Sequence, residues 1–147
     1  MAEYKKIIVA VDGSKESENA FKQAIKIAKQ NKSSLLLVHV IDLRTFSTIN
    51  AYDQSIVDRA DKYAKDMLDG YLDEAREAGL TDVRSIIDYG SPKVKIAKEI
   101  VQKYDADLIV CGATGLNAVE RLLIGSVSEY IVRNASCDVL VVRTPKN

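Results

Sequence analysis

Five short stretches of the chain carry the apolar patterns that strands show. Four of them, 6–12, 35–41, 107–111 and 139–143, are nearly continuous runs of apolar residues rich in Val, Ile and Leu. Such runs are typical of strands in a parallel sheet, which helices cover on both faces. The fifth stretch, 83–89, alternates more between apolar and polar residues, as expected of a strand nearer a sheet edge.

Between these stretches, apolar residues recur at the spacing of one helix face. Helices are predicted after Ser14, a good N-cap residue, and over 53–78, 92–104 and 126–133. The segment 42–52 is polar and has no period, so we expect a long loop there. The apolar face of the longest predicted helix consists of Ile56, Val57, Ala60, Tyr63, Ala64, Met67, Leu68, Tyr71, Leu72 and Ala75.

The predicted elements alternate between strand and helix along the whole chain. Strands connected in this way run parallel with right-handed crossovers, so their helices lie on both faces of one sheet. The sequence therefore predicts an α/β fold: a three-layer, doubly wound, five-stranded parallel sheet of the Rossmann-like kind. With 147 residues, 47% hydrophobic and 29% charged, the chain has the size and composition of a single domain over 1–147.

Charge and composition narrow the classes of partner. The 21 Lys and Arg residues balance 21 Asp and Glu residues, which disfavours binding to nucleic acid or to an anionic membrane. No run approaches the roughly 18 to 20 apolar residues of a membrane-spanning helix, and the N-terminal residues lack the apolar core of a signal peptide. The two cysteines, Cys111 and Cys137, need no disulfide framework. We therefore expect a cytoplasmic protein whose partners are small molecules or proteins.

Several chemistries are disfavoured because their motifs are missing. Neither the P-loop pattern nor a GxGxxG dinucleotide pattern occurs, which argues against a P-loop NTPase or a dinucleotide oxidoreductase. One histidine and two separated cysteines do not provide the spacing of a structural zinc site. His39 lies within an apolar run, so we expect a neutral histidine with its hydrogen bonds satisfied in the core.

The fold class predicts where a ligand binds. In doubly wound sheets the ligand crevice lies beyond the carboxyl ends of the strands, where the strand order reverses. The first strand delivers 12–14 to this edge of the sheet, and the fourth delivers 112–115. Strand orders 2-1-3-4-5 and 3-2-1-4-5 are both candidates, and the sequence leaves that choice open.

A cluster of glycines marks the second of these segments. Three of the seven glycines, Gly112, Gly115 and Gly125, fall in one window that ends where a helix begins. Glycines allow close backbone approach and a helix N-terminus offers free N–H groups, so the window is a candidate anion site. The hydroxyl groups that would add donors to phosphate oxygens belong to Thr114, Ser126 and Ser128. The alternative is that these glycines only end a strand and cap helices.

The glycine window has the form Gly112-x2-Gly115-x9-Gly125-Ser126. With the strand 107–111 before it and 138–143 after it, the window resembles the universal stress protein family. The segments 7–14 and 39–42 are similar to that family too, so the resemblance covers essentially the whole chain. Members of the family that bind ATP carry this glycine motif, and every position of the motif is filled here.

The resemblance implies an adenine nucleotide alpha hydrolase-like fold and a site for ATP or another adenine nucleotide, with Mg or Mn. It implies that Ala10, Asp12 and the backbone of Val40 surround adenine and ribose. The residues implied around the phosphates are Gly112, Ala113, Thr114, Gly115, Leu116, Asn117, Gly125, Ser126, Val127 and Ser128. Ser14 and Arg121 are further candidates. Two alternatives stay open, namely that Asp12 only caps its own loop and that Arg121 is a solvated residue on a helix face.

The leading functional hypothesis is a nucleotide-binding regulatory protein of the stress response. Occupancy by the nucleotide would alter its conformation or its binding to an unidentified regulatory protein. The alternatives are a slow ATPase or nucleotidyl-transfer enzyme, and an interaction scaffold in which the nucleotide is structural. Because the glycine loop contains no lysine, we expect weak hydrolysis at most.

Two further expectations concern surfaces of the molecule. The segment 42–52 leaves its strand at the same edge as the glycine loop and is either a mobile flap over the nucleotide or a connection without function. The last strand, 139–143, is apolar and has only four residues after it, so it is expected at a sheet edge unless it is internal or shielded by a helix. Antiparallel pairing with its own copy would form a homodimer, which the resemblance also implies.

Overall fold

The computed structural model describes residues 3–42, 54–114 and 124–143. Its centre is a five-stranded, all-parallel sheet with the strand order β3-β2-β1-β4-β5. The predicted fold class is confirmed, and of the two candidate strand orders the chain adopts 3-2-1-4-5. The strands are β1 Lys6–Ala10, β2 Ser34–Ile41, β3 Val83–Tyr89, β4 Leu108–Gly112 and β5 Asp138–Val142.

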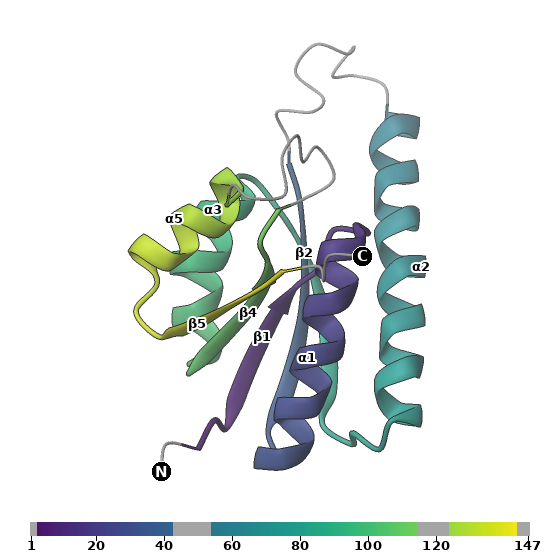
Figure 1. Cartoon of the computed structure of the whole chain (residues 1–147). Coiled ribbons are helices and arrows are strands. Elements are labelled where there is room, and N and C mark those ends of the chain that lie inside the picture. Colours follow the sequence, from purple (N-terminus) through teal and green to yellow (C-terminus); the bar gives the residue numbers. More distant parts are fainter. Residues whose placement is uncertain (1–2, 43–53, 115–123, 144–147) are drawn as a thin grey trace.

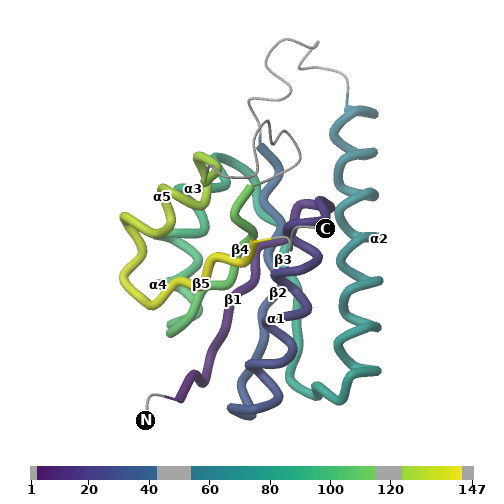
Figure 2. Tube along the Cα trace, in the orientation of Figure 1, coloured from purple at the N-terminus to yellow at the C-terminus, as the bar shows by residue number. Residues whose placement is uncertain are grey.

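Helices cover both faces of this sheet (Figure 1). On one face, α1 and α2 lie side by side, whereas α3, α4 and α5 cover the other face (Figure 2). The segment predicted as one helix over 92–104 contains a π-helical turn, η2, between α3 and α4. The helical elements are α1 Lys15–Asn31, α2 Gln54–Glu77, α3 Pro92–Val94, η2 Lys95–Ile100, α4 Val101–Tyr104 and α5 Ser126–Asn134.

The sheet separates two hydrophobic cores. Ile7 and Val9 of β1 pack toward α1 and α2, where Phe21 is fully buried. Ile8, on the opposite face of the same strand, packs toward α4 and α5, where Ile131 is fully buried. Every residue of this strand's centre is therefore buried, which explains its continuous apolar run. In the described ranges, no helix has both the length and the apolar character needed to cross a membrane.

The first strand is shorter than the apolar run that predicts it. β1 ends at Ala10 rather than Asp12, because Asp12 and Gly13 form the turn into α1. Gly13 has φ +86°, a conformation that L side chains rarely adopt. The edge positions of β3 and β5 agree with the predictions from their sequence patterns.

Candidate functional site

The strand order reverses between β1 and β4, which places a topological switch point at their carboxyl ends. From β1 the chain enters α1 on one face of the sheet, and the segment after β4 leads to α5 on the other face (Figure 1). Ala10 and Gly112 are the last residues of these two strands, and Asp12 and Thr114 come two residues after them at the same edge. Val40, 8% exposed, lies next to the carboxyl end of the neighbouring strand β2.

The turn after β1 is held by its own side chains. The Oδ1 atom of Asp12 accepts a hydrogen bond of 2.9 Å from the backbone N–H of Ser14. Ser14 is buried, and its Oγ atom accepts a bond of 3.1 Å from the N–H of Ser17, which caps α1. Asp12 therefore does cap its own loop, and the Ser14 hydroxyl is occupied by the helix cap. Neither bond uses the second carboxylate oxygen of Asp12.

At the other strand, hydrogen bonds join the start of α5 to the end of β4. The Ser128 hydroxyl, in a residue 4% exposed, donates to the carbonyl oxygen of Gly112. The N–H of Gly125 donates to the carbonyl oxygen of Ala113 at 2.7 Å. Ser126 and Val127 in the first turn of α5 are exposed. The arrangement presents the N-terminus of α5, with its partial positive charge, at the switch point.

The described glycines of the motif have different physical roles. A Cβ atom on Gly112 would lie 2.9 Å from the backbone carbonyl carbon of Glu16, so glycine here allows β4 to approach α1 closely. Gly125 is the N-cap of α5 and has φ −66°, a conformation open to any residue. Both positions agree with the alternative that these glycines end a strand and cap helices, since Gly112 ends β4 and Gly125 caps α5. Close packing requires a glycine at Gly112, whereas the backbone conformation of Gly125 does not require one.

Two side chains near this edge have raised pKa values. Burial raises the pKa of the Cys111 thiol to about 11, although a hydrogen bond with Ser128 acts in the opposite direction. The hydroxyl of Tyr89, at the end of β3, donates a hydrogen bond to the carboxylate of Asp61 in α2, and chiefly this bond raises the pKa of Tyr89 to about 12. His39 is partly buried, and its Nδ1 atom lies at hydrogen-bond distance, 2.8 Å, from the carbonyl oxygen of Val11. This contact agrees with the expected structural role of His39.

The structure also brings Tyr63 of α2 to this edge, and the sequence pattern does not predict Tyr63 as a residue of the site. The sequence places Tyr63 on the apolar face of α2, yet the residue is 59% exposed and its hydroxyl end lies against Gly13. The helical spacing gave no signal that separates this position from the buried ones. Four predicted site residues, Gly115, Leu116, Asn117 and Arg121, lie outside the described residues, as does nearly all of the proposed flap over 42–52.

The chemistry of the described edge suits an anion rather than a protein-bound metal cluster. The described ranges contain no group of three or more His, Cys, Asp or Glu residues that could hold a metal ion. The N-terminus of α5 lies at one strand end, and the carboxylate of Asp12 lies at the other. An anionic ligand that brings its own metal ion fits this donor set.

Comparison with known proteins gives a consistent result. The model of the universal stress protein family matches residues 3–143. A universal stress protein of Staphylococcus saprophyticus is 49% identical over 144 residues, covering 98% of this chain and 86% of the relative. The structure of UspA from Lactobacillus plantarum superposes with a TM-score of 0.86 at 31% identity, over 97% of this chain and 100% of that one. A universal stress protein in complex with cAMP has a TM-score of 0.73 at 29% identity, over 98% and 100%.

Proposed function

This chain belongs to the universal stress protein family, and from that premise we propose that it binds an adenine nucleotide, specifically ATP, at the carboxyl ends of β1 and β4. The observation that carries the proposal is the exposed first turn of α5, which Ser128 and Gly125 tie to the end of β4 at the switch point. The relative in complex with cAMP supports an adenine nucleotide as the ligand class.

In this proposal, Ala10, Asp12 and the backbone of Val40 surround adenine and ribose. The phosphates lie against the loop that begins at Gly112, with Arg121 as an additional cation, and against the backbone N–H groups of the first turn of α5. The hydroxyl groups of Ser14 and Ser128 already bond to protein atoms, so these residues position the ligand-binding backbone.

A divalent ion, Mg or Mn, would be held chiefly by phosphate oxygens, with the Asp12 carboxylate as the protein ligand. When bound, the ion would neutralise part of the triphosphate charge. Asp12 fits this role because its Oδ1 atom is fixed by the Ser14 N–H. The ion should therefore tighten the binding of ATP more than that of AMP.

We further propose that occupancy of this site regulates the protein in the cytoplasm. The residues assigned to the site include no lysine, histidine or glutamate to orient a nucleophile, so hydrolysis would be slow at most. Binding of nucleotide would then change the conformation or the partners of the protein. The partner we can identify by chemistry is a second copy of the chain, paired through the edge strand β5.

Two measurements test the nucleotide site. Protein purified without added ligand is denatured, and the released small molecules are identified; we expect ATP or another adenine nucleotide. Calorimetry then compares ATP binding by the wild type, Gly125→Leu and Gly70→Leu. The backbone conformation of Gly125 is open to any residue, so we expect Gly125→Leu to fold and to lose about tenfold or more in ATP affinity, because the side chain would obstruct the helix N-terminus.

Gly70→Leu is the matched control, since a Cβ atom at Gly70 in α2 meets nothing within 4 Å. Gly112→Leu would be a poor test, because any side chain there collides with α1. The proposal is wrong if the wild type binds no adenine nucleotide, or if Gly125→Leu binds ATP as tightly as the two other proteins.

A further inference from the structure

Tyr63 departs from the pattern of the helix face to which it belongs. On α2, the small and apolar residues Ala64, Leu68 and Ala75 are buried, whereas Tyr63 is 59% exposed. α2 lies alongside α1, and its N-terminal turns extend past the start of α1 (Figure 1). Core packing therefore does not account for the aromatic ring at this position, and an exposed amphipathic ring can contact a ligand.

The hydroxyl end of Tyr63 reaches the turn that follows β1. A Cβ atom built on Gly13 would lie 2.7 Å from the Tyr63 hydroxyl oxygen and 3.8 Å from its ring Cζ atom. This contact places an aromatic side chain next to Asp12, at the strand end where we propose that adenine and ribose bind. A phenol hydroxyl both donates and accepts hydrogen bonds, so at this position it can bond to a ligand beside the turn.

The part of α2 that carries Tyr63 is fixed to the sheet. The carboxylate of Asp61, two residues earlier, accepts a hydrogen bond from the hydroxyl of Tyr89 at the end of β3. Met67, one turn later, also approaches Gly13, with its Sδ atom 3.5 Å from the position of a Cβ. Contacts before and after Tyr63 along α2 therefore hold the helix in place, so the ring has a fixed position. A residue that forms part of a binding site needs such a fixed position.

We infer that Tyr63 forms the α2 side of the nucleotide site and contacts the nucleoside part of the ligand. The inference rests on the proposed function and adds to it a residue that the glycine motif does not contain. A planar ring suits a purine base, because base and ring bury apolar surface and stack, and the phenol hydroxyl can bond to ribose or base. Binding of the phosphates, which we place at the N-terminus of α5, would not depend on Tyr63.

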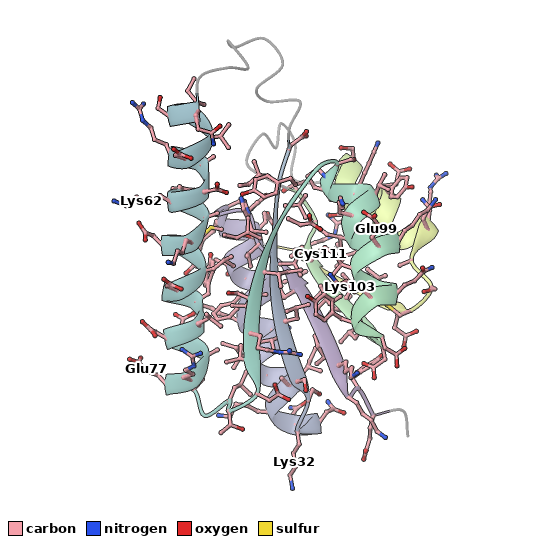
Figure 3. All side chains as sticks on the ribbon, turned by 180° about the vertical axis from the view of Figure 1, so that it is seen from behind. Lys32, Lys62, Glu77, Glu99, Lys103 and Cys111 are labelled. Atoms are coloured by element: carbon pink, nitrogen blue, oxygen red, sulfur yellow. The ribbon has the colours of Figure 1, made fainter. Side chains whose placement is uncertain are left out.

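The test compares AMP and ATP affinities of the wild type with those of Tyr63→Ala, Tyr63→Phe and Lys62→Ala. Lys62 lies on the same turn of α2 but its side chain points away from the sheet, so it controls for effects on the helix (Figure 3). Tyr63→Ala should weaken AMP and ATP equally, by about tenfold. Tyr63→Phe should lose less affinity than Tyr63→Ala, and Lys62→Ala should bind both nucleotides as tightly as the wild type.

Nuclear magnetic resonance tests the contact between Tyr63 and the nucleotide in the wild type, so this test does not depend on how well the alanine variant folds. The ring resonance of Tyr63 is identified by its absence from the spectrum of Tyr63→Phe. In the wild type, we expect AMP to shift this resonance through the ring current of adenine and inorganic tripolyphosphate to leave it unchanged.

The possible outcomes separate the two proposals. If the wild type binds no adenine nucleotide, the proposed function is wrong and this inference with it. If the wild type binds and Tyr63→Ala binds equally well, or if the loss is confined to ATP, the site stands and the role of Tyr63 is wrong. An AMP-insensitive Tyr63 resonance in a protein that binds AMP would likewise exclude the contact.

Discussion

At the scale of single residues, Gly112 and Gly70 differ in how much space a side chain would have. A Cβ atom at Gly112 would lie 2.9 Å from both the carbonyl carbon and the Cβ atom of Glu16, so α1 would have to move. A Cβ atom at Gly70 would meet nothing, and Gly70 lies within α2. Gly112→Ala should therefore cause strain, whereas Gly70→Ala should replace a poor helix former with a good one.

We expect Gly112→Ala to lower the free energy of unfolding by about 1 to 3 kcal/mol, because overpacking forces α1 away from β4. Gly70→Ala should raise it by about 0.5 to 1 kcal/mol, because alanine restricts the unfolded chain and favours the helix. Urea denaturation of both variants measures the two effects. A Gly112→Ala variant as stable as the wild type would show that the close approach is not important for folding.

Cys111 predicts a pH dependence of stability. The residue is 3% exposed and lies in the interior (Figure 3), and burial raises the pKa of its thiol from 9.0 to about 11. The folded protein therefore retains the thiol proton at pH values where the unfolded chain releases it. The contribution of the neutral Cys111 thiol to the free energy of unfolding is therefore fully present below pH 9, and it is lost as the pH rises from about 9 to about 11.

The measurement is the free energy of unfolding of the wild type minus that of Cys111→Ala, at pH 8 and at pH 10.5. This difference should fall by about 2 kcal/mol between the two pH values. Cys137→Ala, at a cysteine that is only partly buried, should show a smaller change. The same difference for Cys111→Ala at both pH values would contradict the prediction.

At the scale of helices and strands, sequence and structure agree where one physical signal dominates. The apolar run of β2 predicts a strand buried on both faces, and β2 lies inside the sheet. Ser14 predicts the start of α1 because its hydroxyl can cap the helix, and the cap is present. The alternation of elements predicts the layers, since crossovers of one hand allow few other arrangements.

The sequence is less informative where the outcome depends on contacts between elements. The π-helical turn η2 keeps the same residues buried as an ordinary helix would, so the apolar spacing of 92–104 does not distinguish the two. The packing role of Gly112 depends on the position of α1, and the position of Tyr63 depends on the turn at Gly13. Such tertiary contacts leave no local pattern in the chain.

At the scale of the whole molecule, we expect two copies of the protein to associate through the edge strand β5. In the described residues β5 pairs with β4 alone, and four of its five residues are only partly buried. The other edge strand, β3, is packed against α2 and tied to it through Tyr89. β5 is therefore the edge at which unpaired backbone groups most favour pairing with a second chain.

The direction of the backbone groups identifies which residue of β5 would make that pairing. The N–H of Ala113 donates to the carbonyl oxygen of Val142, so the backbone of Val142 faces β4. Backbone groups of consecutive residues point to opposite sides of a strand, so those of Val141 face the open edge. Its side chain packs partly against the core, which makes lysine at this position a poor probe of the edge.

Val141→Pro removes one outward-facing N–H and keeps an apolar side chain, so we expect a folded monomer where the wild type forms a dimer. Leu140→Pro removes an N–H that faces β4 and should instead lower the thermal stability of the domain. Size-exclusion chromatography with light scattering, together with circular dichroism, distinguishes these results. A wild type that is monomeric at micromolar concentration with and without ATP, or a Val141→Pro variant that stays dimeric, would show that the copies do not pair through β5.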